Sequence, residues 1–143
     1  SGRLRHYINA FGEEVMVENT DRAIAMACAA TGASVTDYTA APVYFSEKSN
    51  GAHEWLIEFG TPPADMEAFA DKLDESLRAV NSDYDAKRYK DIALSRLILH
   101  PLPKGAFTEW LRSKGKLGGQ HKVPRLSNDR LLLEEIRQTS LLV

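Results

Sequence analysis

The chain has 143 residues, of which 43% are hydrophobic and 27% are charged, and its formal net charge at pH 7 is −2. This is the size and composition of one domain with its own core, and the weak overall charge argues against a general nucleic-acid binder. No apolar run approaches the ~20 residues that span a bilayer, and the single cysteine forms no internal disulfide, so we expect a cytoplasmic protein.

The N-terminal segment predicts a hairpin followed by a helix. Residues 6–17 contain two short strand-like runs separated by Gly12, which favours a turn. An alanine-rich helix is expected over residues 21–32, with Asn19 or Thr20 as its N-cap and the glycine at its end as its C-cap.

Two extended runs follow this helix. Residues 34–45 are rich in β-branched and aromatic side chains, and Pro42 within them indicates an edge strand or a bulge. Residues 46–52 contain an Asn-Gly pair and predict a hairpin connection. Residues 53–59 alternate, so that one face of this second strand carries Trp55, Ile57 and Phe59.

Residues 62–80 give the clearest helical pattern in the chain. Apolar residues recur at helical spacing and form one stripe, made up of Met66, Phe69, Ala70, Leu73 and Leu77. We interpret the acidic residues of this segment as a solvated face and not as catalytic groups; they are Asp65, Glu67, Asp71, Asp74 and Glu75.

The C-terminal part predicts helices and one further strand. A short helix over residues 83–90 is expected to have Ser82 as its N-cap, and a strand over residues 92–102 is expected to be closed by prolines. A helix is expected over residues 105–115, and a final helix over residues 128–140.

Together these elements predict one α+β domain over residues 1–143. Residues 13–100 follow the order strand–helix–strand–strand–helix–strand, which is the split βαβ order of ferredoxin-like folds. We therefore expect a ferredoxin-like core with a small mixed or antiparallel sheet and extra C-terminal helices. Such a fold hosts enzymes, regulatory modules and RNA-binding domains, so it does not indicate a function by itself.

Positive charge is concentrated near the C-terminus. Residues 112–130 hold six Lys and Arg residues against one acidic residue. Within them, Gly118 and Gly119 permit close approach of the backbone to a ligand, and their amides can face an anion. Lys122 follows with a compact ammonium group, and Pro124 stiffens the chain behind it. From the residues alone, a solvated loop, a phosphate-facing loop and a nucleic-acid patch are all open.

No other group of residues indicates a catalytic or metal site. The four histidines lack the spacing of metal ligands, so we expect no bound metal. Cys28 lies among alanines in a predicted helix, which favours core packing over the role of a nucleophile.

Four separated stretches resemble one enzyme family. They are GRLRHYINAFGEEV (residues 2–15), HEWLIEF (53–59), LDESLRAVNSDYDAKR (73–88) and GQHKVPRLSNDR (119–130). In this order, they resemble the C-terminal domain of the auxin-responsive-promoter-type acyl-acid amido synthetases. That family is similar to the adenylate-forming enzymes, which activate a carboxylic acid with ATP as an acyl-adenylate.

The resemblance implies that the chain is the mobile C-terminal domain of a larger two-domain ligase. In such enzymes a large N-terminal domain binds most of ATP, Mg²⁺ and the carboxylic acid, and the acyl group is then conjugated to an amino acid. The small domain rotates between the two half-reactions. This fragment alone is then expected to be inactive, to bind no cofactor, and to have its own N-terminal domain as partner, with no nucleic acid or membrane involved. The absence of an initiator Met fits such a fragment.

Individual residues carry over from the motifs of the family. Lys122 matches the adenylation lysine of the loop GQ-x-K-x-PR. Residues 1–5 match the hinge segment between the two domains, and within them the hinge residues are Arg3 and Arg5. The residues expected to support Lys122 at the cofactor are Gly118, Gly119, Gln120 and Arg125.

The sequence departs from the pattern of the family at several positions. Arg5 stands where most members of the superfamily have Asp or Lys, and Asn9 lies near the position of a family Lys, so the hinge contacts are expected to differ. His121 and Val123 replace the Tyr and Thr that are frequent in the plant enzymes, which favours a bacterial member.

Two other interpretations stay open beside this one. The chain is a free-standing ferredoxin-like module that binds a ligand or RNA through its basic segment, or it is an inactive member of the family retained for interaction. A salt-sensitive RNA complex of the fragment alone is what the first of these predicts.

Overall fold

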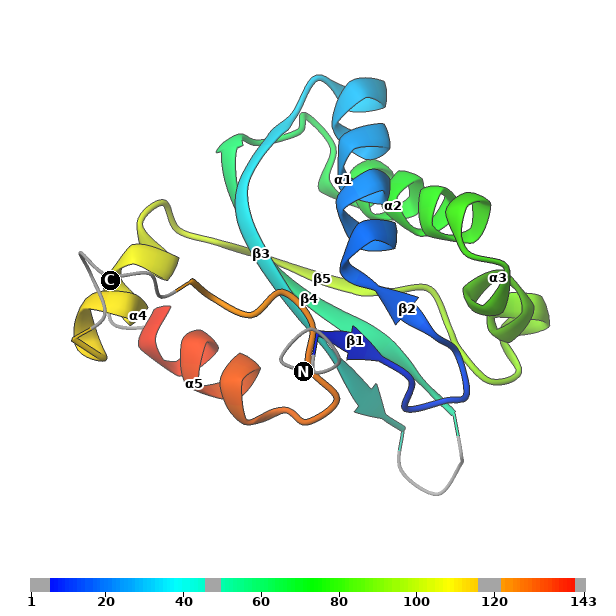
Figure 1. The fold of residues 1–143 in the computed structure, drawn as a ribbon. Coiled ribbons are helices and arrows are strands. Elements are labelled where there is room, and N and C mark those ends of the chain that lie inside the picture. Colours follow the sequence, from blue (N-terminus) through cyan, green and yellow to red (C-terminus); the bar gives the residue numbers. More distant parts are fainter. Residues whose placement is uncertain (1–5, 46–49, 116–121, 141–143) are drawn as a thin grey trace.

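The computed structural model describes residues 6–45, 50–115 and 122–140, and Figure 1 shows their arrangement. The chain begins with a hairpin of β1 (Tyr7–Ile8) and β2 (Val15–Met16), which pair antiparallel. Gly12 turns the chain between them with a φ of 90°, a left-handed backbone angle that favours glycine. The hairpin predicted at this end of the chain is therefore confirmed.

Helix α1 (Val17–Thr31) begins before its predicted start. Neither Asn19 nor Thr20 is its N-cap, so that prediction is wrong. Asn19 lies inside the first turn, where its side-chain oxygen accepts a hydrogen bond from the backbone N–H of Met16 at 2.9 Å. The C-terminal end is confirmed, because Gly32 adopts a φ of 79° and its N–H donates to the carbonyl oxygen of Cys28.

The main sheet has three strands, β3 (Ser34–Tyr44), β4 (Gly51–Thr61) and β5 (Ile98–Leu102), in the order β3-β4-β5. β3 and β4 are antiparallel, whereas β4 and β5 are parallel. β3 is an edge strand, as Pro42 indicated. Where β4 begins, a Cβ atom on Gly51 would lie 2.0 Å from the carbonyl oxygen of Val43, so only glycine fits there.

β5 is shorter than the strand predicted over residues 92–102. The residues before it make one isolated bridge, in which Leu94 lies beside Gly51. Pro101 does not close the strand but lies within it, opposite Ile57 of β4. An edge strand tolerates proline because one side of its backbone has no ladder to complete.

The helices after β4 follow the prediction with shifts at their ends. They are α2 (Met66–Val80), α3 (Ser82–Arg88) with the 3-10 turn η2 (Tyr89–Asp91), α4 (Ala106–Ser113) and α5 (Leu131–Ser140). The N-cap of α3 is Asn81 and not Ser82, because the Asn81 side chain accepts a hydrogen bond from the N–H of Tyr84 at 2.7 Å.

The sheet is covered on both faces. Figure 1 shows α1 and α2 on one side of it and α4 and α5 on the other. Trp55, Ile57 and Phe59 point into the core cluster under α1 and α2, as the alternation predicted, while Leu56 joins the cluster under α4 and α5. β4 is therefore buried along both faces, which explains why polar residues of this strand are buried as well.

The predicted fold class is confirmed: the chain is an α+β protein with a small mixed sheet and added C-terminal helices. The predicted order of elements is also present. Val15–Met16 pairs with Tyr7–Ile8 in a separate two-stranded sheet, and β5 lies beside β4. Among the described residues, no helix combines the length and apolar character needed to cross a membrane.

Candidate functional site

The backbone that follows Lys122 is tied to the edge of the main sheet. The N–H of Ala40 in β3 donates to the carbonyl oxygen of Arg125 at 2.8 Å, and the N–H of Ser127 donates to that of Ala40 at 3.2 Å. The Thr39 hydroxyl donates to the carbonyl oxygen of Pro124 at 2.8 Å. Residues 123–127, which we call the anchored segment, thus lie alongside β3 through one isolated bridge between Ala40 and Leu126, which fixes the chain directly after Lys122.

Lys122 itself is exposed and lies where two pockets meet. The large pocket, of about 870 Å³, lies between the anchored segment, the start of the described chain and the helices α4 and α5. The small pocket, of about 250 Å³, is lined on its other sides by His6, Val17, Asp37, Val123 and Arg125. The ammonium group of Lys122 is therefore available to an anion in either pocket.

The positive charge of residues 112–130 is largely neutralised in the fold. Among the described residues of this stretch, Lys122 is the one cation without an ion pair. The others are bound to acids, in the pairs Arg112–Glu109, Lys114–Glu135, Arg125–Asp21, Arg130–Glu54 and Arg130–Glu134. The charge cluster that the sequence displays is therefore not a basic surface of equal cations, but one unpaired lysine among paired ones.

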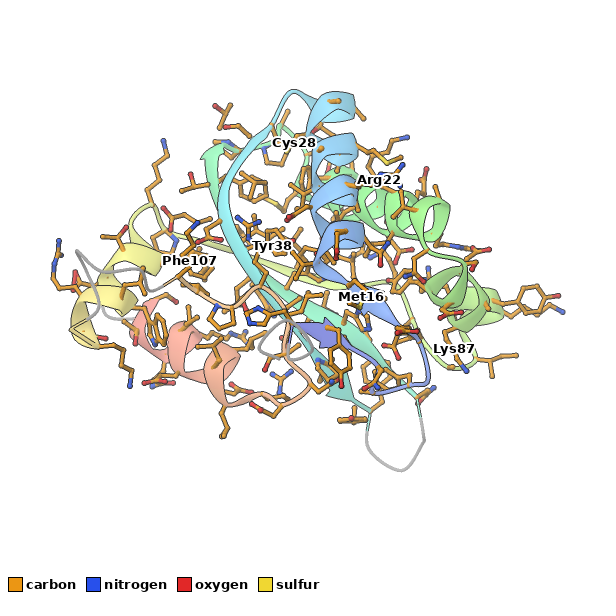
Figure 2. All side chains as sticks on the ribbon, viewed as in Figure 1. Met16, Arg22, Cys28, Tyr38, Lys87 and Phe107 are labelled. Carbon is orange, nitrogen blue, oxygen red and sulfur yellow. The ribbon has the colours of Figure 1, made fainter. Side chains whose placement is uncertain are left out.

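Arg125 is held by a cluster of residues that sequence reasoning missed. Its guanidinium Nη1 donates to Oδ1 of Asp21 at 2.9 Å, its Nε lies 3.6 Å from Oδ1 of Asp37, and its Cζ lies 5.2 Å from the centroid of the Tyr38 ring. The Tyr38 hydroxyl donates to the same oxygen of Asp21 at 2.7 Å. Figure 2 marks Tyr38 at the centre of the molecule. No spacing in the sequence connects these acids with Arg125, so nothing in the chain indicated this cluster.

Two groups in this cluster titrate away from their ordinary ranges. Burial raises the pKa of the Tyr38 hydroxyl, and Asp21 beside it adds to that effect. Burial also raises the pKa of Asp37, more than the neighbouring Arg125 lowers it. Tyr38 is therefore a neutral hydrogen-bond donor here and not an acid–base group.

The start of the described chain lies beside Lys122. His6 lines both pockets that Lys122 lines, and Tyr7 lines the large one. The N–H of Asn9 donates to the side-chain oxygen of Asn128 at 2.9 Å, a contact between residues far apart in the sequence. The segment that follows the predicted hinge is thus linked directly to the segment that carries the predicted catalytic lysine.

Several predicted site residues fall outside the described residues. These are the hinge segment 1–5 with Arg3 and Arg5, and the loop residues Gly118, Gly119 and Gln120. Their roles stay predictions. Within the described residues, no group of three or more His, Cys, Asp or Glu side chains is placed to hold a metal ion. Cys28 is half-buried, and burial raises the pKa of its thiol, which disfavours a nucleophile.

The motif NSDYDAKR, residues 81–88, is tied to helix α2. Asp74 accepts hydrogen bonds from the Tyr84 hydroxyl at 2.6 Å and from Nη2 of Arg88 at 2.9 Å. All three residues are buried, so the interpretation of Asp74 as part of a solvated face is wrong. Burial works against the charge of Arg88, but Asp74 and Asp91 outweigh it and raise the pKa of the guanidinium. The helical spacing of α2 did not indicate that Asp74 is buried, because the residues that cover it come from the next helix.

Two histidines are paired with buried carboxylates. His53 Nε2 lies 2.5 Å from Oε2 of Glu13, and His100 Nε2 lies 2.6 Å from Oε2 of Glu54. Burial works to raise the pKa of both carboxyls, but the histidines, together with Arg130 at Glu54, hold them below their ordinary values. The His53–Glu13 pair fastens the hairpin to β4, and the His100–Glu54 pair links β5 to β4. Helix α5 is tied to the sheet by Arg137, which also pairs with Glu54.

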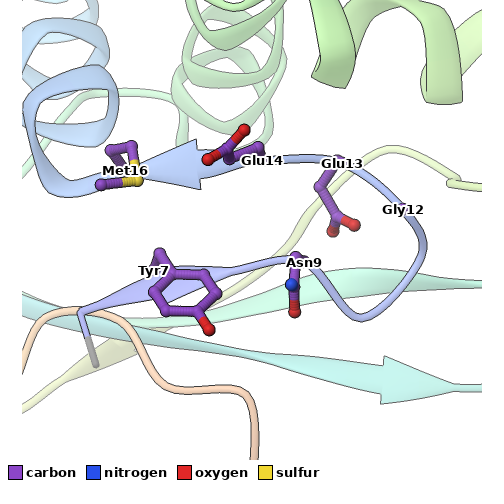
Figure 3. A pocket seen from close by; sticks show the side chains of 6 residues that line it. All are labelled: Tyr7, Asn9, Gly12, Glu13, Glu14 and Met16. Atoms are coloured by element: carbon purple, nitrogen blue, oxygen red, sulfur yellow. The ribbon is translucent and has the colours of Figure 1, made fainter. Parts of the chain in front are cut away.

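A third pocket, of about 450 Å³, lies on the β1–β2 hairpin (Figure 3). Its lining residues are Tyr7, Asn9, Gly12, Glu13, Glu14 and Met16. Glu13 has its two oxygens engaged, by His53 and by the N–H of Phe11 at 2.7 Å. The pocket therefore offers no free buried charge to a ligand, and the candidate site is the one around Lys122.

Comparisons with known proteins identify a family and a fold. A scan against protein-family models matches residues 18–131 to the GH3 family C-terminal domain. Among solved structures, GH3.15 acyl acid amido synthetase is similar with a TM-score of 0.72 and 17% identity, over 94% of this chain and 25% of that chain. The structure of AtGH3.15 acyl acid amido synthetase in complex with 2,4-DB has a TM-score of 0.71 and 18% identity, over 94% of this chain and 26% of that chain.

At these identities the two structures establish a shared fold. The chain spans about a quarter of the length of the solved structures that it matches. A search of curated protein sequences finds no match.

Proposed function

This chain belongs to the GH3 family, as its C-terminal domain, and on that premise we propose that it supplies the catalytic lysine, Lys122, of an ATP-dependent acyl acid amido synthetase. The observation that carries the proposal is that Lys122 is an exposed, unpaired cation on a fixed backbone where two pockets meet. The N-terminal domain, which the family implies as partner in the full chain, completes the site.

The proposed reaction has two steps. First, a carboxylate oxygen of the acid attacks the α-phosphorus of ATP; a P–O bond forms, the bond to the β-phosphate breaks, and pyrophosphate leaves. Second, the amine nitrogen of an amino acid attacks the acyl carbon of the acyl-adenylate. A C–N bond forms, the C–O bond to the phosphate breaks, AMP leaves, and the nitrogen loses a proton to solvent.

Lys122 acts in the first step. The attacking carboxylate and the α-phosphate are both anionic, and negative charge accumulates on the phosphate oxygens in the transition state. A fixed ammonium between them offsets this repulsion, and it does so without reorganising because the anchored segment already holds its backbone. One point charge fits a single phosphate contact, so we assign most contacts of ATP and its Mg²⁺ to the N-terminal domain.

Rotation of this domain about residues 1–5 would bring Lys122 to the nucleotide for the first step and remove it for the second. The link between the residues after the hinge and the anchored segment, through Asn9 and Asn128, supports that proposal. The isolated chain is then expected to turn over no substrate. ATP as a substrate fits the cytoplasmic location expected from the sequence.

The observation that favoured an RNA-binding module no longer supports that interpretation. It rested on the concentration of basic residues, and the described ones other than Lys122 are bound to acidic side chains of the same fold.

The test is Lys122→Ala in the full-length enzyme, with the two half-reactions measured separately. We expect acid-dependent ATP–pyrophosphate exchange to fall roughly 10²- to 10³-fold, the size of effect seen when one charge-stabilising donor is removed. Amide formation from preformed acyl-adenylate should stay close to that of the unaltered enzyme.

Arg112→Ala is the matched control, because Arg112 lies in the same basic stretch but is exposed and paired with Glu109. It should leave both half-reactions unchanged. An equal loss of both half-reactions in Lys122→Ala would contradict the assigned role.

A further inference from the structure

We propose that Asp21 of helix α1 is a positioning residue for Lys122 and acts through Arg125; this inference rests on the proposed role of Lys122. Nothing in the sequence motif points to Asp21, which lies more than a hundred residues away from the loop. The connection is made by the fold alone.

The first step of the argument is that Arg125 is held on several sides. Asp21 accepts from its Nη1 at 2.9 Å, the Tyr38 ring lies beneath it, and Asp37 flanks it at 3.6 Å from Nε. Asp21 is itself fixed, because its Oδ1 also accepts from the Tyr38 hydroxyl, and Thr20 bonds that hydroxyl at 2.7 Å. The Tyr38 ring stacks on Trp55 of the central strand at 5.0 Å, so the cluster is attached to the core.

The second step is that holding Arg125 places Lys122. Only Val123 and Pro124 separate the two residues; Val123 is buried, and the proline ring restricts its own backbone. The carbonyl oxygens of Pro124 and Arg125 are both bonded to β3. The ammonium of Lys122 therefore projects from a backbone that is held both by β3 and by the partners of the Arg125 side chain.

The third step concerns charge. Asp37, Arg125 and Lys122 line the same small pocket. While Arg125 lies between Asp21 and Asp37, it occupies both carboxylates. Without Asp21, the Arg125 side chain keeps Asp37 and the Tyr38 ring but loses its closer partner, so it can move. Whenever it leaves Asp37, that carboxylate is available to Lys122 on the same pocket. A lysine paired inside its own domain is withdrawn from an incoming phosphate. Asp21 thus keeps the catalytic cation both placed and unpaired.

The magnitudes favour a functional role for this contact over a structural one. The side chains of Asp21 and Arg125 are 44% and 41% exposed, and an ion pair of that exposure contributes little to folding stability. A displacement of about 1 Å at a catalytic group, however, can reduce the rate roughly 10²-fold. The effect on the rate of adenylate formation should therefore exceed the effect on stability.

The experiment uses the full-length enzyme and the variant Asp21→Asn. We expect the kcat of acid-dependent ATP–pyrophosphate exchange to fall roughly 10- to 100-fold, with the KM for ATP and for the acid within about twofold, as a displaced catalytic group predicts. Amide formation from preformed acyl-adenylate and the midpoint of thermal unfolding should be unchanged. Asp21→Glu, which keeps the carboxylate, should recover part of the loss.

Glu18→Gln is the matched control, since Glu18 is an exposed acid in the first turn of the same helix. It should behave as the unaltered enzyme in both half-reactions. A charge exchange provides a second test: Asp21→Arg and Arg125→Asp should each reduce pyrophosphate exchange, and the double variant should be more active than either.

The outcomes separate this inference from the proposed function. If Lys122→Ala leaves pyrophosphate exchange intact, the role of Lys122 fails and this inference fails with it. If Lys122→Ala is impaired but Asp21→Asn is not, only the inference about Asp21 is overturned. It is also overturned if Asp21→Asn reduces both half-reactions together with the unfolding midpoint, because that pattern indicates a structural role.

Discussion

Two stretches that carry the family resemblance, residues 73–88 and residues 119–130, use their polar side chains in opposite ways. In the first, Asp74, Tyr84 and Arg88 are turned inward and satisfy one another between α2 and α3. In the second, the described part leaves Lys122 exposed and without an ion pair. A motif of charged residues is therefore not by itself the sign of a site, since what matters is whether the fold supplies each charge with a partner.

The two stretches differ in what the fold loses when a charged side chain is removed. The Asp74 carboxylate is buried, so removing it leaves the Arg88 guanidinium in a region of low dielectric constant with fewer partners. Lys122 is solvated in the described fold, so its removal costs the domain little. The first stretch should therefore respond to mutation in stability, and the second in activity.

The largest effect on stability is expected for Asp74→Ala. Breaking a buried, hydrogen-bonded ion pair by removing one partner costs about 3–5 kcal/mol of unfolding free energy. Asp71→Ala is the matched control one turn earlier on α2, because Asp71 is exposed and forms a surface pair with Arg96, worth about 0–1 kcal/mol. Urea unfolding of the domain measures both.

The same measurement on Lys122→Ala sharpens the comparison. Its unfolding free energy should lie within about 0.5 kcal/mol of the unaltered domain, as for a surface substitution. If Lys122→Ala destabilised the domain as much as Asp74→Ala, the distinction between the two stretches would collapse.

An intermediate effect is expected at the N-cap of α3. Asn81 accepts from the N–H of Tyr84 at 2.7 Å and donates to the carbonyl oxygen of Glu14 at 2.8 Å, so it joins α3 to the N-terminal hairpin. Asn81→Ala should cost about 1–2 kcal/mol, whereas Ser82→Ala at the cap that the sequence predicted should cost less than about 0.5 kcal/mol. Equal losses in the two variants would argue against Asn81 as the cap.

A pH dependence is expected at Arg130, the last residue of the second stretch, because it pairs with a buried carboxylate as Arg88 does in the first. Arg130 bonds the buried carboxylate of Glu54 at 2.6 Å. Burial works to raise the pKa of Glu54, but His100 and Arg130 hold it below the ordinary value of 4.5. Because the folded pKa is lowered, the stabilisation is complete above the pKa of the unfolded chain and is lost as pH falls through the folded pKa.

Glu54→Gln tests this linkage. The variant should be less stable than the unaltered domain at pH 7, and the difference should shrink as pH falls below about 4.5, the ordinary value for Glu. Glu75→Gln on the exposed face of α2 is the control and should show no such convergence. Urea midpoints between pH 7 and pH 3 provide the measurement, and parallel curves for Glu54→Gln and the unaltered domain would refute the linkage.

Prediction from the sequence succeeded where a pattern is local and repeated. The alternation in residues 53–59 and the apolar stripe of α2 each place several residues at once, and both agree with the core. It failed where a single polar side chain has a partner that no repeated pattern marks. Asn19 has the type of an N-cap but binds the Met16 N–H from inside the helix, and Asp74 has the spacing of a solvated acid but is covered by α3.

The candidate site shows the same contrast between residues that a local motif identifies and residues that only packing brings together. The loop residues alone predicted only that glycine amides and a lysine there could face an anion. The family resemblance is what named Lys122 and Arg125. The acids that hold Arg125 come from α1 and β3, and no spacing in the sequence connects Asp21 or Asp37 with residue 125. Side chains brought together by packing leave no periodic signal in the chain.

By itself, the sequence determined the elements and the strand face that packs under α1 and α2, since hydrophobic spacing and backbone restrictions act between near neighbours. Its resemblance to a family named the lysine to test. Only the tertiary structure decided which charged side chains form ion pairs. The cations of residues 112–130 look equivalent in the sequence. They differ because the folded chain places acids from α1, β4, α4 and α5 beside the paired ones and leaves Lys122, among those described, without an ion pair.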